Sequence, residues 1–336
     1  MTMLDVKDLT LHFKVKEGWV YAVEDVNITL EKGETLGLVG ESGCGKTTLG
    51  YGISQLLPDN AHVKGGQVIF KGQDILTPSL KKDGTLKPYR QEIRELRWKE
   101  ISMIFQGAMN AFNPVQKVGD QIIEAIRVHN KKMPRQEALA RVEDLYKLIG
   151  IPRDRIDNYP HEYSGGMRQR AMIAMALVHN PSLIIADEPT TALDVIMQRR
   201  ILSEIKKIQN EFHMAMIIIT HDVSVVANVA DKIAVMYAGR IMEYGNIKDV
   251  FKTSANPYTK ALFGGFPSLK GPKKRIASIP GNPPSLVEPP SGCRFHPRCK
   301  YAKEICKTDR PPFVTLPTGQ ISLCHFAEQV QQGVMQ

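Results

Sequence analysis

The chain has 336 residues, more than a typical single domain, so we expect one large domain with a smaller appendage. Hydrophobic residues make up 43% of it, enough for a packed core, which excludes a mostly disordered protein. The net charge is +9, and the first residues carry neither a basic segment nor a long apolar segment, so we expect no secretory signal. The apolar runs are too short to cross a bilayer, so any membrane role is expected to come through partners.

Three short apolar runs are predicted to be buried parallel strands. They span residues 35–39, 183–186 and 216–220, and each is followed by glycine or charged residues. Helical patterns are found at residues 47–57, 121–128, 136–149, 167–178 and 198–212. This alternation predicts an α/β fold that binds its ligand at the carboxyl ends of the strands.

The composition changes near Pro257, where prolines become frequent and helical or strand periodicity is lost. We place a domain boundary near residue 252 and expect residues 252–336 to form a small, loop-rich domain. Such a unit has little core of its own, so a bound metal would stabilise it.

Residues 40–47 read Gly-Glu-Ser-Gly-Cys-Gly-Lys-Thr, a complete match to the phosphate-binding P-loop between a predicted strand and helix. Glycines let backbone N–H groups surround the phosphates, and the helix N-terminus adds a favourable dipole. Lys46 is expected to bridge the β- and γ-phosphates and Thr47 to hold Mg²⁺. The alternative is a glycine turn with a chance Lys-Thr. The residues assigned to phosphate binding are Gly40, Ser42, Gly43, Cys44, Gly45, Lys46, Thr47 and Thr48.

Two further motifs supply either carboxylates or unpaired backbone N–H groups at the start of a helix. Asp187 and Glu188 end a buried strand, where the first would reach Mg²⁺ and the second the attacking water. Their alternative role is to cap a helix. Ser164-Gly165-Gly166 opens a helix and offers an anion site, although the same sequence serves as an ordinary helix cap.

In order and spacing, these motifs with Gln106, Asp194 and His221 resemble the nucleotide-binding subunit of ABC transporters over about residues 6–250. The resemblance implies an ABC ATPase fold of the P-loop NTPase class over residues 1–251, with a mixed, largely parallel sheet and a helical subdomain inserted at roughly 107–180. It also implies a head-to-tail dimer that holds two ATP molecules between P-loops and Ser164-Gly165-Gly166 segments.

The same resemblance implies individual roles. Lys46, Gln106, Glu188 and His221 would form the catalytic set, in which Glu188 polarises water and His221 contacts the γ-phosphate; taken alone, His221 is equally a strand-end histidine. Thr47, Gln106 and Asp187 would hold Mg²⁺. Asp194 would lie in the loop that links the two sites of the dimer. An aromatic residue would stack on adenine, and we choose Phe13, with Trp19 and Tyr21 as alternatives.

A closer resemblance, to the oligopeptide/dipeptide permease branch, is carried by residues 101–106, 112–114, 187–195, 279–281 and 292–299 with Cys306 and Cys324. It implies an ATP-hydrolysing subunit that powers peptide import from the cytoplasmic face of the membrane. Its partners would be two transmembrane permeases, a second homologous ATPase (identical or distinct) and an extracytoplasmic substrate-binding protein. Residues 109–115 would contact the permease. Import of nickel chelates or sugars stays open, and a soluble ABC ATPase acting on nucleic acid is disfavoured because no coiled-coil insertion is present.

Four of the five cysteines, Cys293, Cys299, Cys306 and Cys324, cluster near the C-terminus with a spacing that fits zinc poorly. Four thiolates around a [4Fe–4S] cluster are chemically reasonable, and the resemblance implies such a cluster. Zinc, unligated buried thiols and a mixed site with His296 or His325 are the alternatives. Residues 268–310 contain ten Lys or Arg against three Asp or Glu. This excess would offset the charge of a cluster, so no nucleic-acid partner is needed to explain it.

Overall fold

The computed structural model describes residues 1–87, 91–107, 112–189, 195–265 and 279–335. They divide into two compact units. The first unit contains residue 1, residues 31–34 and residues 89–219, and the second contains residues 2–30, 35–88 and 220–336.

The first unit is built on parallel strands. Strand β6 (Ile101–Ile104) pairs with β7 (Leu183–Asp187), which pairs with β8 (Ala215–Thr220). In this register Ile101 lies opposite Leu183, and Leu183 lies opposite Ala215. Every residue of β7 and β8 is buried, as expected for a parallel strand covered on both faces.

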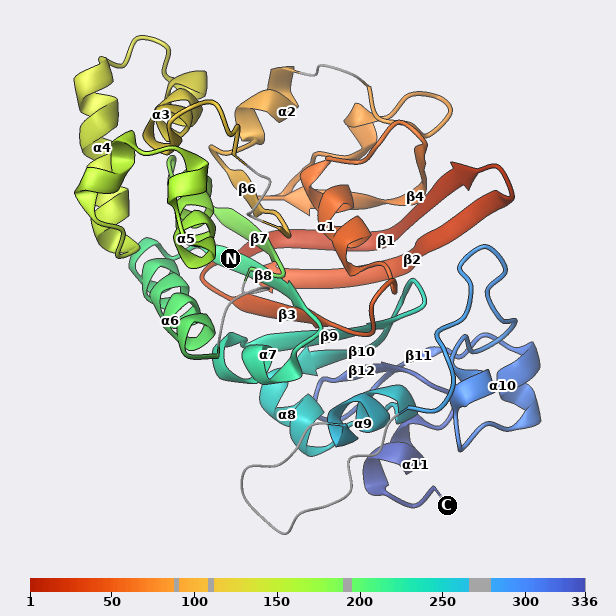
Figure 1. Cartoon of the computed structure of the whole chain (residues 1–336). Coiled ribbons are helices and arrows are strands. Elements are labelled where there is room, and N and C mark those ends of the chain that lie inside the picture. Colours follow the sequence, from red (N-terminus) through yellow and green to blue (C-terminus); the bar gives the residue numbers. More distant parts are fainter. Residues whose placement is uncertain (88–90, 108–111, 190–194, 266–278, 336) are drawn as a thin grey trace. The chain divides into compact units, whose positions relative to one another are not determined.

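Helices make up the rest of the first unit, and α3, α4 and α5 pack against one another (Figure 1). The helix α3 presents Ile122, Ile123 and Ile126 as an apolar face, the spacing of an amphipathic helix. The helices are α2 (Gln91–Leu96), α3 (Val118–His129), α4 (Arg135–Leu148), α5 (Gly165–Ala176) and α6 (Val195–Phe212), with short 3-10 turns at Arg153–Asp157 and Pro160–Glu162.

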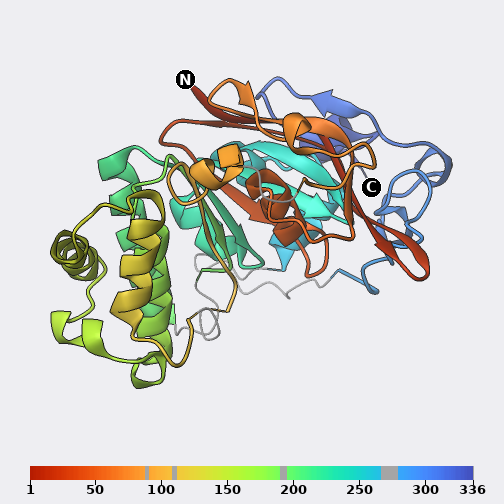
Figure 2. The same cartoon turned by 90° about the horizontal axis from the view of Figure 1, so that it is seen from above.

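The second unit contains two sheets. The antiparallel one has the order β2-β1-β4-β5, and its long strands β1 and β2 are red in Figures 1 and 2. In the other, β3 pairs with β9 in parallel, and β10, β12 and β11 follow in antiparallel order. The strands are β1 (Thr2–Val15), β2 (Gly18–Glu31), β3 (Thr35–Val39), β4 (Ala61–Phe70), β5 (Gln73–Asp74), β9 (Lys232–Tyr237), β10 (Arg240–Asn246), β11 (Phe313–Thr315) and β12 (Ile321–Leu323).

The helices of the second unit are short. They are α1 (Lys46–Ser54), α7 (Val223–Val229), α8 (Ile247–Lys252), α9 (Pro257–Gly264), α10 (Glu304–Thr308) and α11 (Ala327–Gln332), with 3-10 turns at Thr77–Ser79 and His296–Arg298.

The C-terminal residues share the core of the second unit. Tyr258, Phe295 and Leu323 pack in one hydrophobic cluster with Val39 of β3 and residues of β9. The Asn256 side-chain nitrogen donates to the carbonyls of Met242 at 3.0 Å and Leu323 at 3.1 Å. A separate cysteine-rich domain is therefore not confirmed, and the boundary at residue 252 stays a prediction.

The three predicted strands are confirmed within one residue at each end, and the five predicted helices are present with shifts of a few residues. In the described parts of the chain, no helix is both long enough and apolar enough to cross a bilayer.

Candidate functional site

The P-loop follows β3 in the second unit, and its glycines have backbone conformations that other residues adopt at a cost. Gly40, Gly43 and Gly45 have φ of 155°, 77° and 108°. A Cβ at Gly40 would lie 2.0 Å from the Met236 carbonyl oxygen, and one at Gly45 would lie 2.2 Å from the Ala22 carbonyl oxygen. Backbone packing therefore requires glycine at both places.

Lys46 is the first residue of α1, and its side chain turns back over the loop. Its Nζ donates to the carbonyl oxygens of Gly40 at 2.8 Å and Glu41 at 2.9 Å. Cys44 is buried, and this burial raises the pKa of its thiol. A buried thiol with a raised pKa is poorly reactive, so Cys44 would contribute its backbone alone.

The three candidates for the adenine platform lie on the antiparallel sheet of the second unit. The Trp19 ring carries the Lys64 ammonium 3.8 Å from its centroid, and the Tyr21 ring packs edge-on against His12. Phe13 lies in β1 opposite Ala61 and is half-buried. The assignment of Phe13 stays a prediction.

In the first unit, the residues assigned to Mg²⁺ and water lie at strand ends. Asp187 ends β7 with only 1% of its surface exposed. Glu188 follows with φ of 45°, a left-handed conformation that a side chain rarely adopts, and its N–H donates to the Ile219 carbonyl at 2.8 Å. Gln106, which follows β6, donates from Nε2 to Glu188 Oε2 at 2.8 Å. The structure thus brings Gln106 and Glu188 together.

His221 lies in the second unit on the turn between β8 and α7, and its side chain is exposed. Asp222 follows it and caps α7, because its carboxylate accepts from the Ser224 N–H at 2.8 Å. Asp194 lies outside the described residues.

Ser164 caps α5, because its Oγ accepts from the Met167 N–H at 3.2 Å. Its side chain is exposed, and Gly165 and Gly166 form the first turn of the helix. Tyr163 is buried just before it and shares a 2.9 Å hydrogen bond with the Tyr146 hydroxyl. The N-terminus of α5 is therefore capped and exposed, and the buried Tyr163 anchors the residue just before it.

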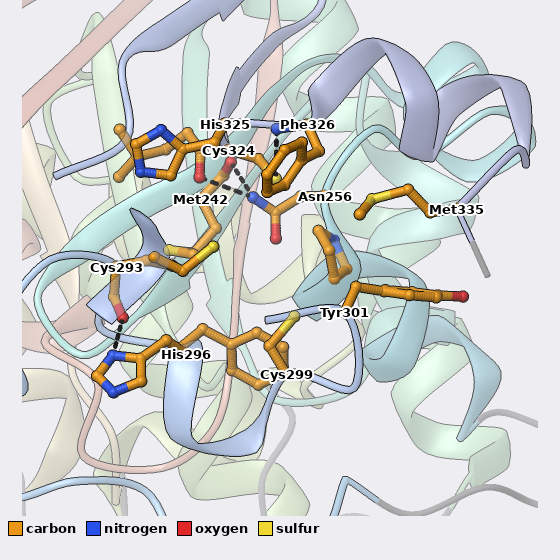
Figure 3. Close-up of a pocket in the computed structure, with 14 residues that line it drawn as sticks. Met242, Asn256, Cys293, His296, Cys299, Tyr301, Cys324, His325, Phe326 and Met335 are labelled. Atoms are coloured by element: carbon orange, nitrogen blue, oxygen red, sulfur yellow. Dashed lines mark hydrogen bonds between the residues drawn. The ribbon is translucent and has the colours of Figure 1, made fainter. Parts of the chain in front are cut away.

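The four C-terminal cysteines line one cavity of the second unit, and Figure 3 shows Cys293, Cys299 and Cys324 there. Burial raises the pKa of Cys293 to about 11 and that of Cys324 to about 12, and it also raises the pKa of Cys299. His296 turns its Nδ1 to the Cys293 carbonyl oxygen at 3.0 Å.

The cavity fits a metal site in its donor types but not in its arrangement for a single ion. Four thiols are the donor set that iron–sulfur clusters take. Among the described residues, however, no group of three or more His, Cys, Asp or Glu side chains is placed to hold a metal ion. The expected cluster is therefore not supported by the side-chain geometry.

Part of the basic excess near the C-terminus has a structural explanation that the sequence did not reveal. Three arginines pair with carboxylates elsewhere in the second unit: Arg294 with Glu24, Arg298 with Glu41 and Arg310 with Asp25. These arginines join the C-terminal residues to β2 and the P-loop. Each pair joins residues more than 250 positions apart, so no local pattern could have indicated it.

Two family models match the chain. Residues 23–191 match the ABC transporter model, and residues 242–306 match the model described as oligopeptide/dipeptide transporter, C-terminal region. The oligopeptide transport ATP-binding protein of Escherichia coli is 44% identical over 96% of this chain and 92% of its own length. The dipeptide transport ATP-binding protein of Caldanaerobacter subterraneus is 35% identical over 97% of this chain and 98% of its own length.

Solved structures agree. An ATP-binding cassette in a dimeric, post-hydrolysis state with ADP and Pi has a TM-score of 0.63 and 27% identity, and covers 73% of this chain and 99% of its own. A Clostridium perfringens cassette that is part of an ABC transporter complex has a TM-score of 0.61 and 28% identity. It covers 75% of this chain and 91% of its own. The chain belongs to the ABC transporter family, as an ATP-binding subunit of its oligopeptide/dipeptide branch.

Proposed function

We propose that this chain hydrolyses ATP to power the import of peptides through two permease partners. The observation that carries the proposal is the 2.8 Å contact between Gln106 Nε2 and the Glu188 carboxylate, at the end of a buried strand. It joins Gln106, which is assigned to Mg²⁺, with Glu188, which is assigned to the attacking water. Relatives that match this chain over almost its whole length are named for peptide transport, which supports peptides as the transported substrate.

Different residues would bind the phosphates, Mg²⁺, the attacking water and adenine. Lys46 and the P-loop N–H groups would bind the phosphates, and Thr47, Gln106 and Asp187 would hold Mg²⁺, which neutralises charge on the phosphates. Glu188, held at φ 45°, would orient and polarise the water, and His221 would support the γ-phosphate. Phe13 would stack on adenine.

We further propose that Ser164-Gly165-Gly166 of one subunit closes on the nucleotide of another. The exposed cap of α5 supports this, because a helix N-terminus with free approach suits a phosphate. A solved relative is a dimer, and this chain would pair with an identical or homologous ATPase.

The experiment is a Glu188→Gln variant with ATP and Mg²⁺, alone and with the second ATPase. We expect hydrolysis to fall at least about 100-fold and a stable dimer to appear by light scattering. Glu137→Gln, on the exposed face of α4, is the matched control and should hydrolyse ATP normally. Adding Ser164→Arg should abolish the dimer. A Glu188→Gln variant that stays monomeric with its partner contradicts the proposed dimer.

Permease coupling is proposed for residues 109–115, of which 109–111 lie outside the described residues. Phe112 is 5% exposed, so its side chain serves the fold, whereas Val115 is 78% exposed and available to a partner. Val115→Glu should lower peptide uptake in cells while ATPase activity of the purified chain persists. Unchanged uptake would contradict the proposed permease contact.

The chain would act at the cytoplasmic face of the membrane, with an extracytoplasmic binding protein delivering peptide. Uptake assays with sugars or nickel chelates test the alternative substrates.

We propose that the four cysteines hold a structural [4Fe–4S] cluster. The donor set and the shared cavity support this, since the four thiolates of a cluster bind different iron atoms rather than one ion. Anaerobically purified protein should contain about four iron atoms per chain and absorb visible light. Zinc in a colourless protein, or no metal, rejects the proposed cluster.

We also propose a division into a nucleotide-binding domain at residues 1–251, with a helical subdomain at about 107–180, and a C-terminal extension at residues 252–336.

A further inference from the structure

Arg298 lies on the 3-10 turn between Cys293 and Cys299, and its side chain is 6% exposed. Its guanidinium donates to both carboxylate oxygens of Glu41, from Nη1 at 2.6 Å and from Nη2 at 2.9 Å. Nε donates to the Pro280 carbonyl at 2.7 Å. A two-point contact of this kind fixes the orientation of both side chains.

Glu41 is the second residue of the P-loop, and C-terminal residues hold it at two places. Arg298 holds its carboxylate, and the Tyr258 hydroxyl accepts from its backbone N–H at 3.1 Å. Its carbonyl oxygen in turn accepts from Lys46 Nζ at 2.9 Å. A continuous set of contacts therefore leads from Arg298 through Glu41 to the P-loop lysine.

The charge of Glu41 gives this contact a consequence for binding. A carboxylate inside a loop that takes a triphosphate repels the ligand unless a cation neutralises it. Arg298 supplies that cation, and its pairing with both oxygens keeps the carboxylate turned to the arginine.

We propose that Arg298 is a positioning residue for ATP, which neutralises and anchors Glu41 and so makes the C-terminal segment part of the nucleotide site. The inference rests on the proposed ATP-binding role of the P-loop. It adds a function for a residue between two of the cysteines, whatever those cysteines bind.

The test compares ATP affinity of Arg298→Gln, Glu41→Gln/Arg298→Gln and the wild type, all in the full chain. Arg298→Gln should bind ATP about tenfold more weakly and raise KM by a similar factor, with a smaller change in kcat. The double variant should recover affinity to within about threefold, because no carboxylate is left to neutralise. Arg310→Ala removes an exposed ion pair of the same segment and serves as the control, with wild-type affinity expected.

Two outcomes overturn the proposal. One is wild-type ATP affinity in Arg298→Gln, and the other is a double variant as weak as the single one, which would mean that Arg298 acts only by holding the segment. If Arg298→Gln fails to fold, Arg298→Lys decides, since it keeps the charge that neutralises Glu41: ATP affinity within about threefold of the wild type is expected, and a loss of about tenfold or more overturns the proposal. A wild-type chain that does not bind ATP would instead remove the proposed function itself.

Discussion

The P-loop and the four-cysteine cavity lie in the same unit and are built in different ways. The P-loop is one continuous segment whose shape follows from its own backbone, with glycines at φ 155°, 77° and 108°. The cavity draws its cysteines from four places between residues 293 and 324 and its other walls from β10, α9 and the C-terminal end. The first is therefore a continuous piece of chain, and the second is assembled from segments that are distant in the sequence.

This difference decides how each site responds to change. In the P-loop, substitutions act through clashes with a neighbouring backbone that cannot move far. Around the cavity, stability depends on buried polar contacts that join distant segments, such as Arg294 with Glu24. Substitutions in one region should therefore leave the other undisturbed.

The largest effect is expected for Gly45→Ala. Its Cβ would lie 2.2 Å from the Ala22 carbonyl oxygen at a φ of 108°, so the loop must move. We expect the free energy of unfolding to fall by about 3 kcal/mol or more, with ATP binding lost. Gly43→Ala is the control, since its Cβ meets nothing within 4 Å, and it should cost about 1 kcal/mol for the left-handed conformation. Equal losses in urea unfolding would show that clashes do not fix the loop.

Arg294→Ala is expected to disturb the cavity and leave the P-loop intact. Burial, together with nearby Arg240, lowers the pKa of Arg294 to about 10, and its guanidinium donates to Glu24 and to the Ala238 carbonyl. Removing it takes the guanidinium donor from the Ala238 carbonyl and leaves Glu24 paired with Arg240 alone, at a cost of about 2 kcal/mol. The cavity thiols should then react faster with a thiol reagent while Cys44 stays protected. Equal acceleration at Cys44 would show that the two regions open together.

The sequence predicted those features that depend on local patterns. The apolar runs 35–39 and 183–186 predicted β3 and β7 to within one residue, and the P-loop was visible as a motif because one segment makes it. The grouping of Gln106 with Glu188 came from family resemblance, not from the spacing of 82 residues between them.

The remainder depends on the folded chain. The left-handed conformation of Glu188 and the hydrogen bond of its N–H to Ile219 are backbone features that a sequence does not reveal. The partnership of Arg298 and Glu41 joins residues 257 positions apart. The composition of the C-terminal residues indicated a separate small domain, whereas their side chains pack with β3 and β9 in one core.

Glu243 makes the stability of the cavity region depend on pH. It is fully buried in β10, where its carboxylate accepts from the Ala255 N–H at 2.7 Å, and burial raises its pKa from 4.5 to about 7. The folded state therefore binds the proton more tightly than the unfolded state. The free energy of unfolding should fall as pH rises from about 4.5 to about 7 and stay lowered above that.

A Glu243→Gln variant should remove this dependence. It should be more stable than the wild type by up to about 3 kcal/mol above pH 7, and the difference should vanish below pH 4.5. Urea unfolding across this range measures it, with Glu328→Gln on α11, an exposed carboxylate, as the control. A constant difference at every pH would mean that the side chain acts through packing alone.

The smallest effect is expected for the third arginine of the C-terminal segment. Arg310 and Asp25 form an ion pair whose side chains are 39% and 38% exposed, so water and salt weaken their attraction. Arg310→Ala should change the free energy of unfolding by less than about 1 kcal/mol, and the difference should shrink further in 1 M salt. A double-mutant cycle with Asp25→Asn isolates the pair from the hydrogen bond that Thr10 gives Asp25. A coupling as large as that of Arg294 with Glu24 would mean that burial does not decide which arginine holds the C-terminal residues. A small coupling would mean that, of these three arginines, the buried Arg294 and Arg298 do more to hold the C-terminal residues.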